Sequence, residues 1–220
     1  MIANSLRPIE VLIEGKAAPD SLRAATAAER GDLCQFLSAI FHRPLDAEQI
    51  AALRTPGAAE ALGLGGVGSS ADWEADDIDP RALQHVLAVD FTHIFHAAHD
   101  SVQPYEGIQT GQTDELMGPA AQAVSRFMAG VGFTVAPGQC PDHLAVELAF
   151  MADLLRREAE ALTEQDTSTA DKAASIRRQF VAEHLGRWGQ QVARKISDRA
   201  ESAFYRSIAR LLDEVLDERS

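Results

Sequence analysis

The chain has 220 residues, and its 46% hydrophobic and 24% charged residues are typical of a globular protein with one well-buried core. The 33 acidic and 20 basic residues give a net charge of −13, which disfavours nucleic acid and anionic lipid as partners and favours a basic one. No apolar run is long enough to span a membrane, and Glu10 and Glu14 interrupt the apolar N-terminal stretch, which disfavours a secretory signal. We therefore expect a cytoplasmic protein in which Cys34 and Cys140 are free thiols.

The first third of the chain predicts two helices and a long loop. Thr26–Glu29 has the spacing of a capping box, so we expect a helix to begin there and to place the apolar residues between Leu33 and Ile40 on one face. Asp46–Gln49 repeats this spacing before a second, shorter helix. The segment at about 54–77 is rich in glycine and lacks a Gly-x-x-x-x-Gly-Lys motif, so we predict a flexible loop and not a phosphate-binding site.

The middle of the chain predicts two more helices. Asp79–Pro80 is a favourable helix start, because aspartate caps well and proline is preferred at the first helical position. Apolar residues then recur at helical spacing through Leu83–Phe95. A further helix is predicted over Thr113–Gly130, and the glycines and prolines at about 130–141 interrupt the pattern in a segment that could act as a hinge.

The C-terminal part predicts three helices. Apolar residues from Leu144 to Leu155 recur on one face, and the polar segment Glu164–Ala170 separates this helix from the last two. Trp188 and Tyr205 fall on the apolar faces of those helices and are expected in the core. Since no segment of convincing length alternates as a strand does, we predict an all-α, compact multi-helix bundle that forms a single domain over the whole chain.

The segment Cys140–Met151 combines a proline, a carboxylate and an imidazole at the start of a long amphipathic helix. Asp142 lies in or just before the first turn, where its charge opposes the helix dipole and can accept hydrogen bonds from free backbone N–H groups. His143 is left at the mouth of the helix, and such a pair favours a recognition or catalytic role. The structural alternative is that Asp142 caps the helix while His143 contacts a loop carbonyl.

Three segments together, in this order, resemble the motifs of one family. Asp90–Phe95, followed by Pro104–Gly107, is similar to a pair of motifs written Asp-Tyr-x-x-Leu-Phe and Pro-Tyr-Glu-Ser, with Gly107 in place of the serine. Pro141–Met151 resembles Pro-x-Asp-His…Leu-x-Phe-Met, with the proline displaced by one position so that it directly precedes Asp142, and His184–Ala209 resembles His-Leu-x-x-Trp followed by Phe-Tyr-x-x-Leu-Ala. These motifs resemble those of the TorD/DmsD family, chaperones that mature twin-arginine-exported molybdoenzymes.

The resemblance implies a non-enzymatic, cytoplasmic chaperone of TorD-like all-α fold, with no cofactor of its own. Its partners would be the apo form of a molybdopterin-containing oxidoreductase and the twin-arginine signal peptide of that enzyme, held until cofactor insertion is complete. It also implies a monomer or a domain-swapped homodimer. The residues that it implies for binding the client are Asp142, His143, Tyr105, Glu106, Phe95 and Pro141.

Two other functions remain open at this point. A small helical metalloenzyme could use the region of His93, His96 and His143, although the chain has no Glu-x-x-His motif and His93 and His99 point to different helix faces. No Gly-x-Ser-x-Gly motif or cysteine in a basic context supports nucleophilic catalysis. The second alternative is a structural delta-type subunit that stays bound in a reductase complex.

Overall fold

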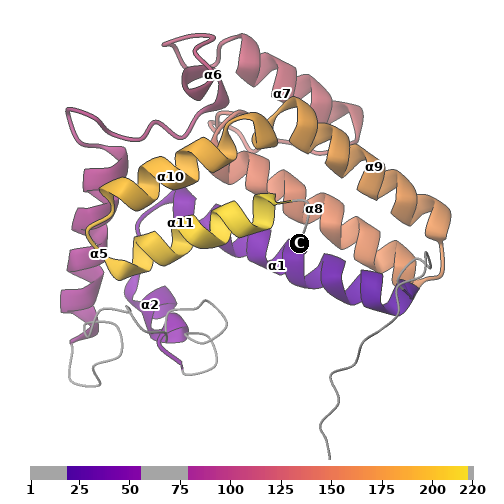
Figure 1. Ribbon diagram of the computed structural model, residues 1–220, viewed down its shortest axis with the longest axis horizontal. Helices are drawn as coiled ribbons and strands as arrows, with labels where there is room; N and C mark the ends of the chain where they lie inside the picture. Colours follow the sequence, from indigo (N-terminus) through magenta and orange to yellow (C-terminus); the bar gives the residue numbers. More distant parts are fainter. Residues whose placement is uncertain (1–18, 56–78, 218–220) are drawn as a thin grey trace, which may run out of the picture.

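The computed structural model describes residues 19–55 and 79–217, which form helices and, within these ranges, no strand (Figure 1). The predicted all-α fold is confirmed. Nearly all of the loop predicted at about 54–77 lies outside the described residues. Among the described helices, none combines the length and the hydrophobicity needed to cross a membrane.

The first helix, α1 (Asp20–His42), begins earlier than its sequence predicted. Thr26 was expected to start it, but Thr26 lies inside the helix, and the residue before its first turn is Pro19. The next two starts are as predicted. Asp46 forms a complete capping box with Gln49 ahead of α2 (Ala47–Leu53), and Asp79 accepts from the Arg81 N–H ahead of α5 (Pro80–Phe95).

The segment after α5 contains one helical turn, α6 (Glu106–Gln109), and then α7 (Pro119–Gly130). The prediction of a helix from Thr113 is wrong for its first six residues, because the helix begins only after Gly118. Leu116 falls within the predicted helix, yet in the structure it lies in the turns before α7 and is 54% exposed. A proline at the first helical position fixes the true start.

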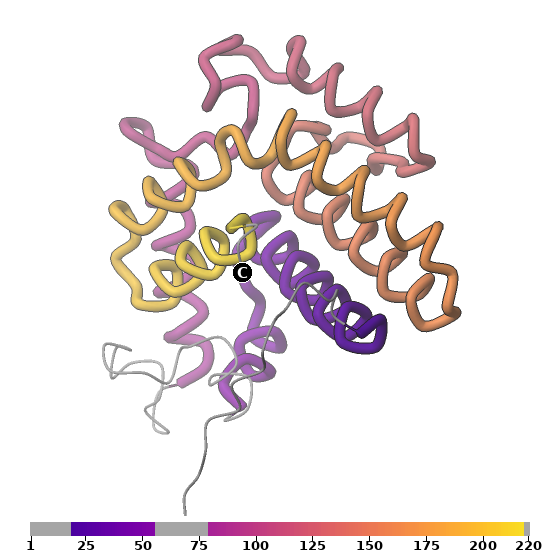
Figure 2. The backbone as a smooth tube through the Cα atoms, turned by 45° about the vertical axis from the view of Figure 1, so that its right-hand side comes forward, coloured from indigo at the N-terminus to yellow at the C-terminus, as the bar shows by residue number. Residues whose placement is uncertain are grey.

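The remaining helices are α8 (Leu144–Thr163), α9 (Thr167–Glu183), the short 3₁₀ helix η1 (Leu185–Arg187), α10 (Gly189–Arg199) and α11 (Ala203–Leu216). Helix α8 is central: it lies between α1 and α9, and α7 lies beyond α9 (Figures 1 and 2). Helices α10 and α11 form a second packed pair, and α5 runs across their ends (Figure 1). The site described below lies where the start of α8 meets the segment before α6.

Most residues of α8 are buried on all of its sides, and small residues let its neighbours come close. A Cβ placed on Gly31 of α1 would lie 3.3 Å from the Leu155 Cβ of α8, so the two helices are in direct contact there. Trp188 and Tyr205 are 1% and 0% exposed, which confirms them as core residues. The connection at 130–141, predicted as a possible hinge, packs Phe133 and Val135 against the core.

Candidate functional site

A short extended segment ahead of α6 is hydrogen-bonded to the start of α8. Tyr105 and His143 form an isolated antiparallel bridge, and their rings meet edge to face with centroids 4.9 Å apart. The Glu106 N–H donates to the Asp142 carbonyl at 2.9 Å, and the Leu144 N–H donates to the Pro104 carbonyl at 2.8 Å. Residues about 40 positions apart in the chain are therefore held in one fixed arrangement.

The cap of α8 is His143 and not Asp142, which contradicts the prediction from sequence. The Nδ1 atom of His143 accepts from the Ala145 N–H at 3.1 Å. Burial lowers the His143 pKa to about 4, with a smaller contribution of the same sign from His42, so the ring is neutral near pH 7 and can accept. The alternative in which His143 contacts a loop carbonyl through its ring is also wrong.

Asp142 points away from the helix and fastens the neighbouring loop. One carboxylate oxygen accepts from the Gly107 N–H at 3.0 Å, and the other accepts from the Cys140 thiol at 3.0 Å. Burial and this hydrogen bond raise the Cys140 pKa to about 11, so the thiol stays protonated at neutral pH. Both cysteines of the chain are free, as predicted. A Cβ on Gly107 would lie 3.3 Å from Asp142, which explains why a small residue fits there.

The Tyr105–His143 pair forms one wall of an apolar hollow of about 420 Å³, which we call the cleft. Its lining comes from the end of α1, the end of α5, the turns before α7 and the start of α8, and includes Phe41, Phe91, Phe95, His96, Tyr105, Leu116, Met117, Cys140, His143 and Val146. Leu116 and Met117 are the most exposed of these, at 54% and 58%. A large apolar side chain that stays open to solvent beside an aromatic hollow favours binding of an apolar ligand.

The structure divides the six predicted site residues into two groups. Phe95, Tyr105 and His143 line the cleft. Glu106, Pro141 and Asp142 lie buried behind it, and Glu106 is only 1% exposed. The role of all six in binding a client stays a prediction. The sequence did not indicate Leu116 or Met117 as site residues: Leu116 lies in the segment predicted as a helix from Thr113, and Met117 is part of none of the motifs.

Behind the cleft lies a buried group of acidic side chains. Glu106 contacts the Nδ1 atom of His184 at 2.9 Å, and the Arg187 guanidinium is 3.9 Å from its other oxygen. Glu147 is fully buried, and neither of its carboxyl oxygens has a hydrogen-bond partner among the described residues. Burial raises its pKa well above the usual range, and the carboxylates of Glu106 and Asp142 add to this effect.

The histidines proposed for a metal site do not converge. His96 and His143 line the cleft, whereas His93 lies in a separate hollow beside Lys195 and Arg199. Within residues 19–55 and 79–217, no group of three or more His, Cys, Asp or Glu side chains is arranged to hold a metal ion. The geometry therefore does not favour the metalloenzyme alternative.

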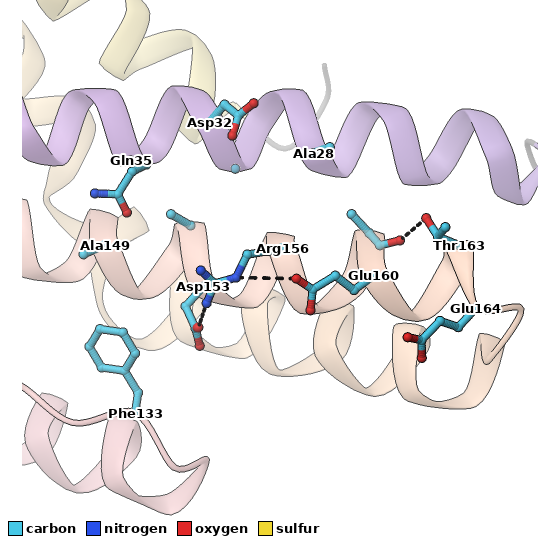
Figure 3. Close-up of a pocket in the computed structure, with 13 residues that line it drawn as sticks. Ala28, Asp32, Gln35, Phe133, Ala149, Asp153, Arg156, Glu160, Thr163 and Glu164 are labelled. Atoms are coloured by element: carbon cyan, nitrogen blue, oxygen red, sulfur yellow. Dashed lines mark hydrogen bonds and ion pairs between the residues drawn. The ribbon is translucent and has the colours of Figure 1, made fainter.

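A second hollow, of about 570 Å³, lies along the seam between α1 and α8, and we call it the acidic groove (Figure 3). Small residues form its floor, among them Ala28 and Ala152. Helix α1 contributes Asp32 and Gln35 to its walls, and α8 and the residue after it contribute Asp153, Arg156, Glu160 and Glu164 (Figure 3). The lining thus contains four carboxylates and a single guanidinium, and the guanidinium of Arg156 pairs with Asp153 and Glu160 (Figure 3).

Comparisons with known proteins agree with the motifs. The family model described as nitrate reductase delta subunit matches residues 69–194. The chain is 29% identical over 137 residues to the chaperone protein TorD of Vibrio parahaemolyticus, and 31% identical over 133 residues to the chaperone protein TorD of Shewanella loihica. These matches cover 61% and 57% of this chain but only 62% and 56% of the relatives, less than two thirds of their lengths.

Among solved structures, the chain is similar to a crystal structure described as a redox enzyme maturation protein from Archaeoglobus fulgidus. The TM-score is 0.51 at 19% sequence identity, and the similarity covers 86% of this chain and 94% of the other. At this identity, the likeness concerns the fold, which is the TorD-like all-α fold that the motifs predicted.

Proposed function

Because this chain belongs to the nitrate reductase delta subunit family, which includes the TorD chaperones, we propose that it is a cytoplasmic, non-enzymatic chaperone for the maturation of a redox enzyme. Its client would be a molybdopterin-containing oxidoreductase. The chaperone would bind the twin-arginine signal peptide of this client and retain it until its cofactor is inserted.

The cleft is the observation that carries this proposal. It combines aromatic walls from Phe91, Phe95 and Tyr105 with an open apolar rim, and the described residues leave it unfilled by their own side chains. Such a hollow suits the apolar stretch of a signal peptide, because affinity comes mainly from the apolar area that both partners bury. Leu116 and Met117 can adapt to different apolar sequences, methionine in particular because its side chain is unbranched and polarisable.

The net charge of −13 supports the same partner. A signal peptide with consecutive arginines carries positive charge, so the acidic surface attracts it and accelerates association. The buried carboxylates of Glu106 and Asp142 are already committed to His184 and to Gly107, so the arginines would meet other acidic groups.

A binding experiment with two matched variants tests the cleft. Leu116→Ala/Met117→Ala removes the exposed rim, and Val86→Ala/Val89→Ala removes two equally exposed apolar residues of α5 that do not line the cleft. Calorimetric titration with a synthetic twin-arginine signal peptide should show weaker binding for the rim variant alone. Equal affinities for the two variants, both still folded, would place the binding surface elsewhere.

The description of the matching family model also favours the alternative of a structural delta-type subunit. A chaperone leaves its client, whereas a structural subunit remains in the assembled enzyme. Co-purification from cells that carry the tagged molybdoenzyme separates the two functions. If the chain is a chaperone, it should co-purify with the immature, cofactor-free enzyme and not with the mature one. Co-purification with the mature enzyme at a fixed stoichiometry would contradict the chaperone proposal.

A further inference from the structure

A third hollow adjoins both the cleft and the acidic groove, and we call the row of three hollows the channel. This third hollow, of about 360 Å³, has lining residues in common with each of the other two. It shares Gln35, Phe133 and Ala149 with the acidic groove. It shares His42, Gln139 and Val146 with the cleft. The three hollows are therefore neighbours along the seam between α1 and α8.

The charge of the lining changes along this channel. The groove end has four carboxylates and one guanidinium, whereas the cleft end is lined by aromatic and aliphatic side chains together with histidines and glutamines, and none of its described lining residues is acidic. Asp153 is paired with both Arg156, at 2.6 Å, and Arg157, at 2.7 Å, and Arg156 also lies 3.9 Å from Glu160, so the negative charge of the groove comes mainly from the other carboxylates. Asp32 and Glu164 have no ion pair with any described residue.

The middle of the channel adds little charge of its own. Its one arginine, Arg43, lies 3.3 Å from Asp46, which offsets it. The Ser38 hydroxyl donates a hydrogen bond to the Ala145 carbonyl at 2.7 Å. A ligand that crosses the middle of the channel would therefore meet polar groups that already have hydrogen-bond or ion-pair partners within the protein.

Given the proposed function, on which this inference rests, we propose that the client signal lies along the α1–α8 seam in one direction. Its basic residues occupy the acidic groove, beside Asp32, Glu160 and Glu164, and its apolar stretch occupies the cleft beside Tyr105 and Met117. In a twin-arginine signal the arginines precede the apolar stretch, so the N-terminal end of the peptide lies at the groove.

The length of the channel fits this occupant. Val146 in the cleft and Glu160 in the groove are 14 residues apart on α8, which corresponds to about 21 Å at 1.5 Å per residue. An extended peptide covers this distance with roughly six residues. Basic residues placed immediately before an apolar stretch can therefore reach the groove while the stretch fills the cleft.

A double-mutant cycle tests the charged end of this arrangement. The protein variant is Asp32→Asn/Glu160→Gln/Glu164→Gln, and the peptide variant replaces both signal arginines by glutamine. The control Glu29→Gln/Glu48→Gln/Asp213→Asn removes the same charge from exposed positions that line none of the three hollows. We expect the groove variant to bind the arginine peptide roughly tenfold more weakly at low salt and to bind the glutamine peptide as the wild type does.

Photo-crosslinking then fixes the direction. A photoreactive residue beside the arginines should attach to α1 or α8 within the groove, and one in the apolar stretch should attach near Met117. Equal weakening by the groove and control variants, or arginine-side crosslinks in the cleft, would overturn the inference while peptide binding itself persists. A wild-type protein that binds neither peptide would instead contradict the proposed function.

Discussion

The ring of His143 packs against Tyr105 and accepts a hydrogen bond from the backbone of α8, and the hydrogen bond requires an unprotonated Nδ1 atom. Its pKa in the folded protein is about 4, below the value near 6.5 of an unfolded chain. Between these two values the unfolded state binds the proton and the folded state does not. His143 therefore contributes stability above about pH 6.5 that is lost as pH falls toward 4.

We predict that His143→Asn flattens this part of the pH dependence. Asparagine keeps a good capping group but does not titrate, so the loss of unfolding free energy between pH 7 and pH 5 should shrink by an amount on the order of 1–2 kcal/mol. Urea unfolding of the wild type and the variant at pH 7 and pH 5 measures this difference in unfolding free energy. An identical pH dependence for both proteins would mean that the His143 pKa is the same in the folded and the unfolded state.

Glu147 contributes to the pH dependence of stability with the opposite sign to His143. Its pKa is raised by burial, so above about pH 4.5 the unfolded state releases a proton that the folded state retains, and stability falls as pH rises. Glu147→Gln should remove this dependence and make the protein more stable at pH 8 than the wild type, with little change near pH 4. Thermal melts at the two pH values test this.

The matched control for that experiment is Glu158 on the same helix. It is also buried, but Arg177 lies 3.5 Å away, so its carboxylate has a charged partner. Glu158→Gln should lower stability at pH 8, because Arg177 would be left without this partner. If both variants were more stable than the wild type at pH 8, the claim that Glu147 lacks a partner while Glu158 has one would be wrong.

At the scale of single residues, three of the six site residues predicted from the sequence line the cleft. Tyr105, Phe95 and His143 were indicated by their motifs, and they do line one hollow. The exchange of roles between Asp142 and His143 was not predictable, because the choice of cap depends on the Gly107 N–H, which the chain brings close only when it folds. Two adjacent polar residues before a helix compete, and tertiary contacts decide the outcome.

At the scale of elements, helix starts with a local cap were predicted correctly. Asp46 and Asp79 cap their own helices through residues two or three positions away, so the signal is complete within the sequence. The start of α1 was missed because Pro19 makes no side-chain cap and the residues before Ala27 include no buried one, so neither a cap nor an apolar stripe marks the first turns.

Two glycines provide a test of how closely the elements pack. A Cβ on Gly186 in η1 would lie 2.6 Å from the Val181 carbonyl oxygen, whereas a Cβ on Gly130 at the end of α7 would meet no atom within 4 Å. We predict that Gly186→Ala lowers the unfolding free energy by about 1–3 kcal/mol. Gly130→Ala should leave it unchanged or raise it by up to about 1 kcal/mol.

Chemical denaturation of these two variants gives the comparison directly. An equal effect of both substitutions would indicate that the corner between α9 and α10 is looser than its contacts imply. The same corner contains Trp188, and Trp188→Ala should cost about 3–5 kcal/mol by removing a fully buried ring. That variant should affect client binding only through the fraction of protein that unfolds.

At the scale of the whole molecule, we infer that apolar burial and electrostatic attraction act at different places on one surface. Apolar burial in the cleft is nearly independent of salt, whereas attraction of arginines to the acidic groove and to the net charge of −13 is screened by salt. The sequence provided the total charge and the apolar motifs. It could not provide their alignment along one seam, because the groove is assembled from α1 and α8, more than 100 residues apart.

The most direct test is calorimetric titration of the wild-type chain with a twin-arginine signal peptide and with its glutamine counterpart, each at about 0.05 M and 0.5 M salt. We predict that the arginine peptide binds more tightly, and that roughly tenfold of its affinity is lost at the higher salt. The glutamine peptide should keep a weaker affinity that hardly changes with salt. Absence of binding by the arginine peptide, or equal and salt-independent affinities for both, would contradict the account.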